Sequence, residues 1–337
     1  MKFLTHAIAL STCITISFLE IGSVDAQQIE HADLKKEKKV ESSTIATFSQ
    51  LMHKAGESIQ VTSFQSGKAK SPRQKMKELR KNVKVVKKGS SNRNAQKISR
   101  NLLPLDRLNE EDRKEVEQIL KNTSFFRETE TLKFEVDPKA YLYFVWNPEM
   151  TVEIWKAMGI SEFRMKPTGK GKYRADTGDG SSGNLRILYR GQYHNVVLGE
   201  GVYKNAFLPK AIRAKVLIHM QTQFSRNQQG KTFATHRVFM HVVFPSSVVE
   251  TASKILEPLS KVIADQNFRD ISLFAYLMSK SMTKQPGWIE HLARSMKNVP
   301  QKKQEQFLKV AAHAYVAANK KTTGKASRTA SGQSVRR

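Results

Sequence analysis

Stretches in which apolar residues fall on alternate positions occupy the middle of the chain. The two longest are residues 212–224 and 232–244, which flank the polar turn Asn227-Gln228-Gln229-Gly230. Two such runs around a short turn containing Asn and Gly predict an antiparallel β-hairpin. Shorter runs of the same kind predict a meander of further strands, at 131–136, 163–166, 173–175, 185–189 and 195–198.

The spacing of apolar residues becomes helical after the hairpin. Ser247 and Glu250 form a capping box, and apolar residues then recur at steps of three and four as far as Met282. We therefore expect one long helix over 247–282, which Pro286-Gly287 ends. Two shorter amphipathic helices are predicted beyond it, at 288–296 and 304–318.

Two helices and one further strand are predicted between residues 109 and 158, on either side of the predicted strand at 131–136. Asn109 can cap a helix that follows Leu108, because its side-chain oxygen can accept from the free amides of the first turn. Residues 140–146 are an unbroken run of β-favouring side chains and predict a strand. Pro148 suits the first position of a helix, so we expect a helix through 149–158.

This order of elements resembles that of the helix-grip fold of START-like lipid-transfer and ligand-binding domains, over residues 134–282. The resemblance implies that a curved sheet wraps the long helix. It also implies which apolar residues line or fill the interior, namely Ile255, Leu259, Ile263, Phe274 and Met278. The predicted class is therefore α+β, with an antiparallel sheet packed on a long C-terminal helix (helix-grip-like) and with disordered basic N- and C-terminal arms.

Four short stretches are also similar to an uncharacterised family of exported planctomycete-type bacterial proteins. They are Asn147-Pro148-Glu149-Met150, Met158-Gly159-Ile160-Ser161, Phe244-Pro245-Ser246 and Gln285-Pro286-Gly287-Trp288. This resemblance implies export and assigns no chemistry to the chain.

The first 26 residues have the pattern of a secretory signal peptide. Lys2 gives a positive start, residues 3–18 are mostly apolar, and Val24-Asp25-Ala26 matches a cleavage site between small residues. We predict cleavage after Ala26, a periplasmic or extracellular location, and no transmembrane segment in the mature chain. The alternative is a lipoprotein signal, in which Cys13 would carry the lipid.

Charge is the other strong signal in the composition. The chain has 57 Lys and Arg against 30 Asp and Glu, a net charge of +27. Thirteen of these cations and one acidic residue lie within 65–100, and a second basic stretch without acidic residues runs over 320–337. Such segments are typically disordered. We therefore divide the chain into a signal peptide at 1–26, a basic arm at 27–102, an α+β domain at 103–299, a helix at 300–319 and a basic tail at 320–337.

A polyanion-rich environment is the partner that this charge indicates. We expect a non-enzymatic exported protein whose basic arms associate with acidic polysaccharide, anionic lipid headgroups or nucleic acid of the envelope or surroundings. One alternative is a carrier that binds an apolar ligand between the sheet and the long helix. Another is a hydrolase whose site the sequence does not reveal. No cofactor, metal or catalytic residue is predicted, and the loss of Cys13 on cleavage excludes thiolate chemistry.

A second possible anion site lies on the predicted sheet. Arg186 and Arg190 are expected on one strand face, with basic residues at the start of the hairpin nearby. Arginine can bind an acidic group with two parallel hydrogen bonds, and tyrosine offers a stacking face. The candidate ligand-binding residues are Arg186, Arg190, Tyr193, Lys210, Arg213 and Lys215. The alternative is that they form an ordinary solvated sheet face.

Histidines and a glycine-rich loop offer weaker candidates. His236 and His241 are five residues apart on one predicted strand, so they should face opposite sides. His219 and His241 could approach each other across the hairpin, but a zinc site needs a third ligand. The 176–183 loop contains Asp176 and Asp179 without the ligand spacing of a calcium loop, and we interpret it as a hairpin turn.

Overall fold

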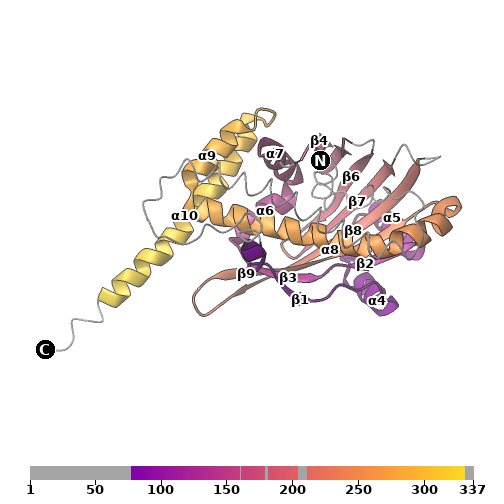
Figure 1. Ribbon diagram of the computed structural model, residues 1–337, viewed down its shortest axis with the longest axis horizontal. Helices are drawn as coiled ribbons and strands as arrows, with labels where there is room; N and C mark the ends of the chain where they lie inside the picture. Colours follow the sequence, from indigo (N-terminus) through magenta and orange to yellow (C-terminus); the bar gives the residue numbers. More distant parts are fainter. Residues whose placement is uncertain (1–76, 160, 179–180, 204–210, 331–337) are drawn as a thin grey trace.

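The computed structural model describes residues 77–159, 161–178, 181–203 and 211–330 (Figure 1). The predicted signal peptide, the cleavage site after Ala26 and most of the predicted N-terminal arm lie outside these residues. Side chains are described in the same ranges except at 203, 212, 246–263 and 321–330.

The described chain is an α+β fold built on one antiparallel sheet of nine strands. In space the order is β1-β3-β9-β8-β7-β6-β5-β4, and β2 also pairs with β9. The strands are β1 (Lys84–Lys87), β2 (Phe125–Glu128), β3 (Thr131–Glu135), β4 (Arg164–Gly169), β5 (Lys172–Asp176), β6 (Ser182–Arg190), β7 (His194–Tyr203), β8 (Ile212–Arg226) and β9 (Thr232–Val243). The predicted antiparallel meander is confirmed, because β4 to β9 are neighbours in chain order.

The helices lie before, between and after the strands. They are α4 (Arg93–Leu102), the 3-10 turn η1 (Leu105–Arg107), α5 (Glu110–Lys121), α6 (Pro138–Trp146), α7 (Pro148–Ala157), α8 (Ser246–Lys284), α9 (Pro286–Ser295) and α10 (Gln301–Ala330). Several start where the sequence predicted. Asn109 caps α5 by accepting from the Asp112 amide at 2.8 Å, and Pro148 occupies the first turn of α7.

The hairpin of β8 and β9 is the longest pairing in the sheet. Its register runs from Lys215 opposite Val243 to Arg226 opposite Thr232. Asn227 closes the turn by accepting from the Lys231 amide at 2.8 Å, and Gly230 takes a φ of 77° that other residues rarely adopt. The two long runs of the sequence therefore formed the predicted hairpin.

Each face of the sheet is covered by different helices. On the face we call the α8 face, β3, β8 and β9 pack against Ala264 and Phe268 of α8. On the opposite face, called the α5 face, β7 and β8 pack against Val116, Ile119 and Leu120 of α5. Figure 1 shows α8 running across the strands, with α9 and α10 gathered near one of its ends.

The largest apolar cluster joins α6, α7, α9 and α10 to the start of the meander. Aromatic rings fill its centre, with Phe274 of α8 lying 5.6 Å from Trp155 and 5.5 Å from Phe144 between ring centroids. Phe307 of α10 is fully buried beside Phe144. α10 is thus anchored through its first half, and its remainder extends away from the sheet (Figure 1).

The strand predicted over 140–146 is wrong, because these residues form α6. Asp137 caps the helix by accepting from the amides of Lys139 and Ala140, and Pro138 occupies its first turn. Ala140, Tyr141, Tyr143 and Phe144 are buried. The cap at Asp137 and the burial of several faces of this segment favour a helix. These two effects outweigh the preference of aromatic and β-branched residues for strands.

The predicted disorder of the N-terminal arm is also wrong from residue 77 onward, so the folded domain begins well before residue 103. β1 pairs with β3, and α4 begins after Asn92, whose side chain accepts from the Ala95 amide at 2.8 Å. Ala95 and Ser99 are buried, while the Lys residues of β1 are exposed. Charge density did not prevent folding here because the charges lie on outward faces. Residues 65–76 lie outside the described chain.

At the other end, α10 is longer than the predicted 300–319 helix. It continues to Ala330, past the predicted end at residue 319, and 331–337 lie outside the described residues. α8 is a single helix of 39 residues that ends before Pro286. Phe274 and Met278 are buried in the core, whereas the side chains of Ile255, Leu259 and Ile263 lie outside the described part.

Candidate anion-binding site

The predicted pairing of Arg186 and Arg190 on one face does not occur, because β6 contains a bulge. The register with β7 shifts between Ile187 and Tyr189, so one extra residue reverses the alternation. Arg186 consequently lies on the α5 face, where it contacts α5. Arg190 lies on the other side and donates to the Tyr173 hydroxyl at 3.0 Å.

Acidic residues of α5 form ion pairs with two of the cations predicted for the site. Arg186 bonds to Asp112 and Glu115, both at 2.5 Å, and Lys215 bonds to Glu115 at 2.8 Å and to Glu200 at 2.6 Å. Burial opposes ionisation of Glu115, but the bonds with Lys215 and Arg186 outweigh it and lower its pKa. Lys215 has a raised pKa because Glu115 and Glu200 accept from it. These cations are already neutralised within the fold.

The other predicted site residues are scattered. Tyr193 is exposed at 53% in the turn between β6 and β7, and Lys210 lies outside the described residues. Arg213 lines an open pocket of about 520 Å³ together with Arg174, Glu200 and Lys215. The structure thus brings Arg213 and Lys215 together, away from Arg190 and Tyr193.

A group of cations that sequence analysis missed lies on the β4–β5 hairpin. We call it the hairpin patch, and its members are Arg164, Lys166, Lys170, Lys172 and Arg174, all exposed. In the described part of the chain, no ion pair holds any of them. Lys166 stands directly opposite Arg174 across the strands, where two like charges destabilise the sheet. The sequence contained a signal for this patch, because its cations alternate with the apolar residues Met165, Tyr173 and Ala175, which are buried. Such alternation places the cations together on the exposed face of the two strands.

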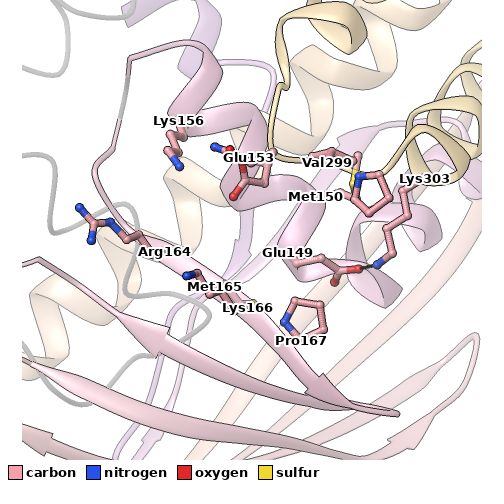
Figure 2. A pocket seen from close by; sticks show the side chains of 12 residues that line it. Glu149, Met150, Glu153, Lys156, Arg164, Met165, Lys166, Pro167, Val299 and Lys303 are labelled. Atoms are coloured by element: carbon pink, nitrogen blue, oxygen red, sulfur yellow. Dashed lines mark hydrogen bonds and ion pairs between the residues drawn. The ribbon is translucent and has the colours of Figure 1, made fainter.

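A pocket of about 430 Å³ lies beside this patch (Figure 2). It is formed by α7, β4, the loop before α10 and the first turn of α10. Its residues are Glu149, Met150, Glu153, Lys156, Arg164, Met165, Lys166, Pro167, Asn298, Val299, Pro300 and Lys303. Figure 2 shows Glu149 and Lys303 meeting on one side, with Lys156 and Arg164 on the opposite side.

The Glu149–Lys303 pair is the buried charged element of this pocket. Glu149 is 5% exposed, its Oε1 accepts from Lys303, and its Oε2 is buried without a hydrogen-bond partner within the described chain. The Tyr173 hydroxyl is close to this carboxylate. Burial and the Glu149 charge raise the pKa of Tyr173, although Arg190 opposes them. The pair ties α10 to α7, while Arg190 and Tyr173 tie β6 to β5.

Two of the buried histidines are structural. As predicted, His236 and His241 face opposite sides of the sheet. Ser272 donates to the Phe268 carbonyl, so we assign Nε2–H of His236 as donor to Ser272 at 2.7 Å and Nδ1 as acceptor from Tyr141 at 2.9 Å.

His241 lies between the hydroxyls of Ser99, at 2.9 Å from Nε2, and Thr123, at 3.2 Å from Nδ1. Ser99 and His241 are 0% exposed, so this serine–histidine contact is closed to substrate. A hydrolase gains no support from it.

His219 meets His194 rather than His241. Nε2 of His219 lies 3.0 Å from Nδ1 of His194, and the rings are stacked. Across the hairpin His219 faces Phe239, whereas His241 faces Leu217. Among the residues that the structure describes, no group of three or more His, Cys, Asp or Glu could hold a metal ion.

The glycine-rich loop after β5 is a turn over its described part. Asp176 accepts from the amide of Gly178, which has a φ of 82°, and the Thr177 amide donates to the Ser181 carbonyl at 3.1 Å. Asp179 lies outside the described residues.

Comparisons with known proteins assign no family to the chain. No family model matches it, and no curated protein does. A solved structure described as a conserved protein from Geobacillus kaustophilus is similar over 45% of this chain and 93% of its own, with a TM-score of 0.33 and 12% identity. In the described part of the chain, no helix is both long and apolar enough to cross a membrane.

Proposed function

We propose that this is a non-enzymatic, exported protein that binds polyanions, with the hairpin patch as a contact surface on its folded domain. The observation that carries the proposal is the set of cations on the β4–β5 hairpin that no ion pair holds among the described residues. Such cations are available to sulfate, carboxylate or phosphate groups, whereas Arg186 and Lys215 are engaged by α5. The net charge of +27 acts in the same direction by attracting polyanions over a longer range.

The predicted basic arm contributes a second surface in this proposal. Lys81, Lys84 and Lys88 are exposed, and no ion pair holds them within the described chain. They lie on or beside β1, which ends the sheet opposite β4. Cations at both edges of the sheet favour association with a long polymer over a single compact ligand.

We include a helix-grip-like arrangement in this proposal, with the sheet curving around α8. Its support is the packing of Ala264 and Phe268 against β8 and β9. A carrier gains less support, because rings fill this interface where it is described. His236 lies 4.4 Å from Phe268 between centroids, and the pocket of about 430 Å³ is lined by other elements.

Charge removal from the hairpin patch tests the polyanion proposal. The variant Lys170→Gln, Lys172→Gln, Arg174→Gln removes three exposed charges without touching the core. For a polyelectrolyte of the charge density of duplex DNA, the slope of log K against log salt should become shallower by roughly two to three units. Binding of labelled heparin and of short duplex DNA across a salt series measures this slope.

A matched control is the variant Lys121→Gln, Lys297→Gln, Lys309→Gln, which removes the same charge from exposed positions on other elements. It should keep most of the salt dependence. If the two triple variants lose affinity equally, net charge alone explains the binding and the hairpin patch is not the contact surface.

A further inference from the structure

The pocket beside the hairpin patch has the size of a small-molecule site. Its volume of about 430 Å³ falls within the range of roughly 300–1,000 Å³ that is typical of ligand pockets. Two regions far apart in the sequence build it, since α7 and β4 contribute lining residues from 149–167, and the start of α10 and the loop before it contribute residues from 298–303.

The floor of this pocket is aliphatic. Met150, Met165 and Val299 are buried there, and the prolines Pro167 and Pro300 also line the pocket. Methionine is flexible and polarisable, so it adapts well to an alkyl chain. None of the 12 lining residues is aromatic, which disfavours the stacking by which proteins hold sugar rings or nucleobases.

The rim of the pocket is cationic. Lys156 of α7 and Arg164 of β4 lie at one end, and Lys166 lies two residues further along β4 (Figure 2). No ion pair holds any of these three within the described chain. Glu153 is the one rim carboxylate that lacks a basic partner among the described residues, because Glu149 is neutralised by Lys303. Three cations against one carboxylate leave the rim with an excess of positive charge.

We infer that this pocket binds a small anionic amphiphile, with its aliphatic body on the floor of Met150, Met165 and Val299 and its anionic head at Lys156, Arg164 and Lys166. Two separate observations carry the inference. The cations that no ion pair holds among the described residues predict the anionic head, and the non-aromatic floor predicts the aliphatic body. This site differs from the polymer-binding function proposed above, although Arg164 and Lys166 border both.

Calorimetric titration of the full-length protein with octyl phosphate tests the inference. Inorganic phosphate serves as a probe that has only the anionic head, and octanol as a probe that has only the aliphatic body. Octyl phosphate should bind at least tenfold more tightly than either. Equal affinity for inorganic phosphate would show that the floor is not used. Equal affinity for octanol would show that the rim is not used. Either result would overturn the inference.

Two variants locate the site. Asn298 is exposed at the mouth, so Asn298→Trp should block the pocket without disturbing the core and should abolish binding of octyl phosphate. Lys156→Gln should weaken octyl phosphate by about tenfold and leave octanol unchanged, because only the head loses a charged partner.

The control is Lys170→Gln, which belongs to the hairpin patch but does not line the pocket, and it should bind octyl phosphate as the unmodified protein does. Unchanged binding in both pocket variants would place the ligand elsewhere and refute the site. Heparin binding by Asn298→Trp should stay unchanged, so failure of this site and failure of the polyanion proposal give different results.

Discussion

Three buried imidazoles should make the stability of this protein fall steeply in mild acid. His219, His236 and His241 are each at most 3% exposed. Burial disfavours the charged form and lowers their pKa to about 3 from the ordinary 6.5. The positive charge of Arg237 adds to the effect on the pKa of His219, and that of Arg100 adds to the effect on the pKa of His241. The folded protein therefore keeps these three rings neutral where the unfolded chain protonates them.

The sign and size of the effect follow from proton linkage. Well above pH 6.5 neither state binds protons at these rings, so their neutrality costs nothing. Between pH 6.5 and pH 3 only the unfolded state binds them, so the free energy of unfolding falls as the pH falls. At pH 5 each ring should cost about 2 kcal/mol, and the three together about 6 kcal/mol. This is comparable with the whole stability of many domains, roughly 5–15 kcal/mol.

Two carboxyl groups, one buried and one partly buried, act in the opposite direction. Asp265 and Asp270 have a raised pKa because of burial, despite the opposing effect of Arg127 on Asp265 and of Arg80 on Asp270. Their folded forms take up protons more readily, which adds stability as the pH falls. A variant of one histidine separates the two effects, since the carboxyl groups are the same in both proteins.

Urea unfolding at pH 7.5, 6.5, 5.8 and 5.0 measures the loss. His236→Gln should be less stable at pH 7.5, because it disturbs the contacts with Tyr141 and Ser272. Between pH 7.5 and 5.0 its stability should fall by about 2 kcal/mol less than that of the unmodified protein. The surface control His291→Gln leaves the buried rings intact and should fall as the unmodified protein does. Equal pH dependence of the unmodified protein and His236→Gln would refute the argument for this ring.

Two further predictions concern the pocket wall and the N-terminus. Lys303→Met should lower the free energy of unfolding by about 1–3 kcal/mol, because it leaves the buried Glu149 carboxylate unpaired, and adding Glu149→Met should restore much of the loss in chemical denaturation. A double variant less stable than Lys303→Met would contradict this account. N-terminal sequencing of the exported protein should find Gln27 first, whereas Met1 or a lipid on Cys13 would disprove cleavage after Ala26.

Local signals in the sequence were sufficient for many elements. The turn at Asn227 to Gly230, the cap at Asn109 and Pro148 at the start of α7 each act within a few residues of themselves. The fold class could also be predicted from the sequence. Apolar residues at alternate positions indicate a sheet with one covered face, and apolar residues at helical spacing indicate helices that pack against such a face.

Local signals misled where tertiary burial reversed them. Tyr141, Tyr143 and Phe144 favour a strand in isolation, yet α6 is helical because it is capped by Asp137 and enclosed by other helices and the sheet. The N-terminal arm has the composition of a disordered segment, yet Ala95, Ser99 and Leu102 dock α4 against the sheet. Composition averages over a segment, whereas docking depends on a few inward positions.

The sites depended most on the tertiary structure. The bulge in β6 puts Arg186 and Arg190 on opposite faces, and no spacing in the sequence reveals one inserted residue in a pairing register. The partners that neutralise Arg186, Asp112 and Glu115, lie more than 70 positions away along the chain. The sequence alone determined that the protein is strongly basic and where its charges lie along the chain. Only the fold decided which of those charges are paired, because charges distant in sequence meet only when the elements that bear them pack together.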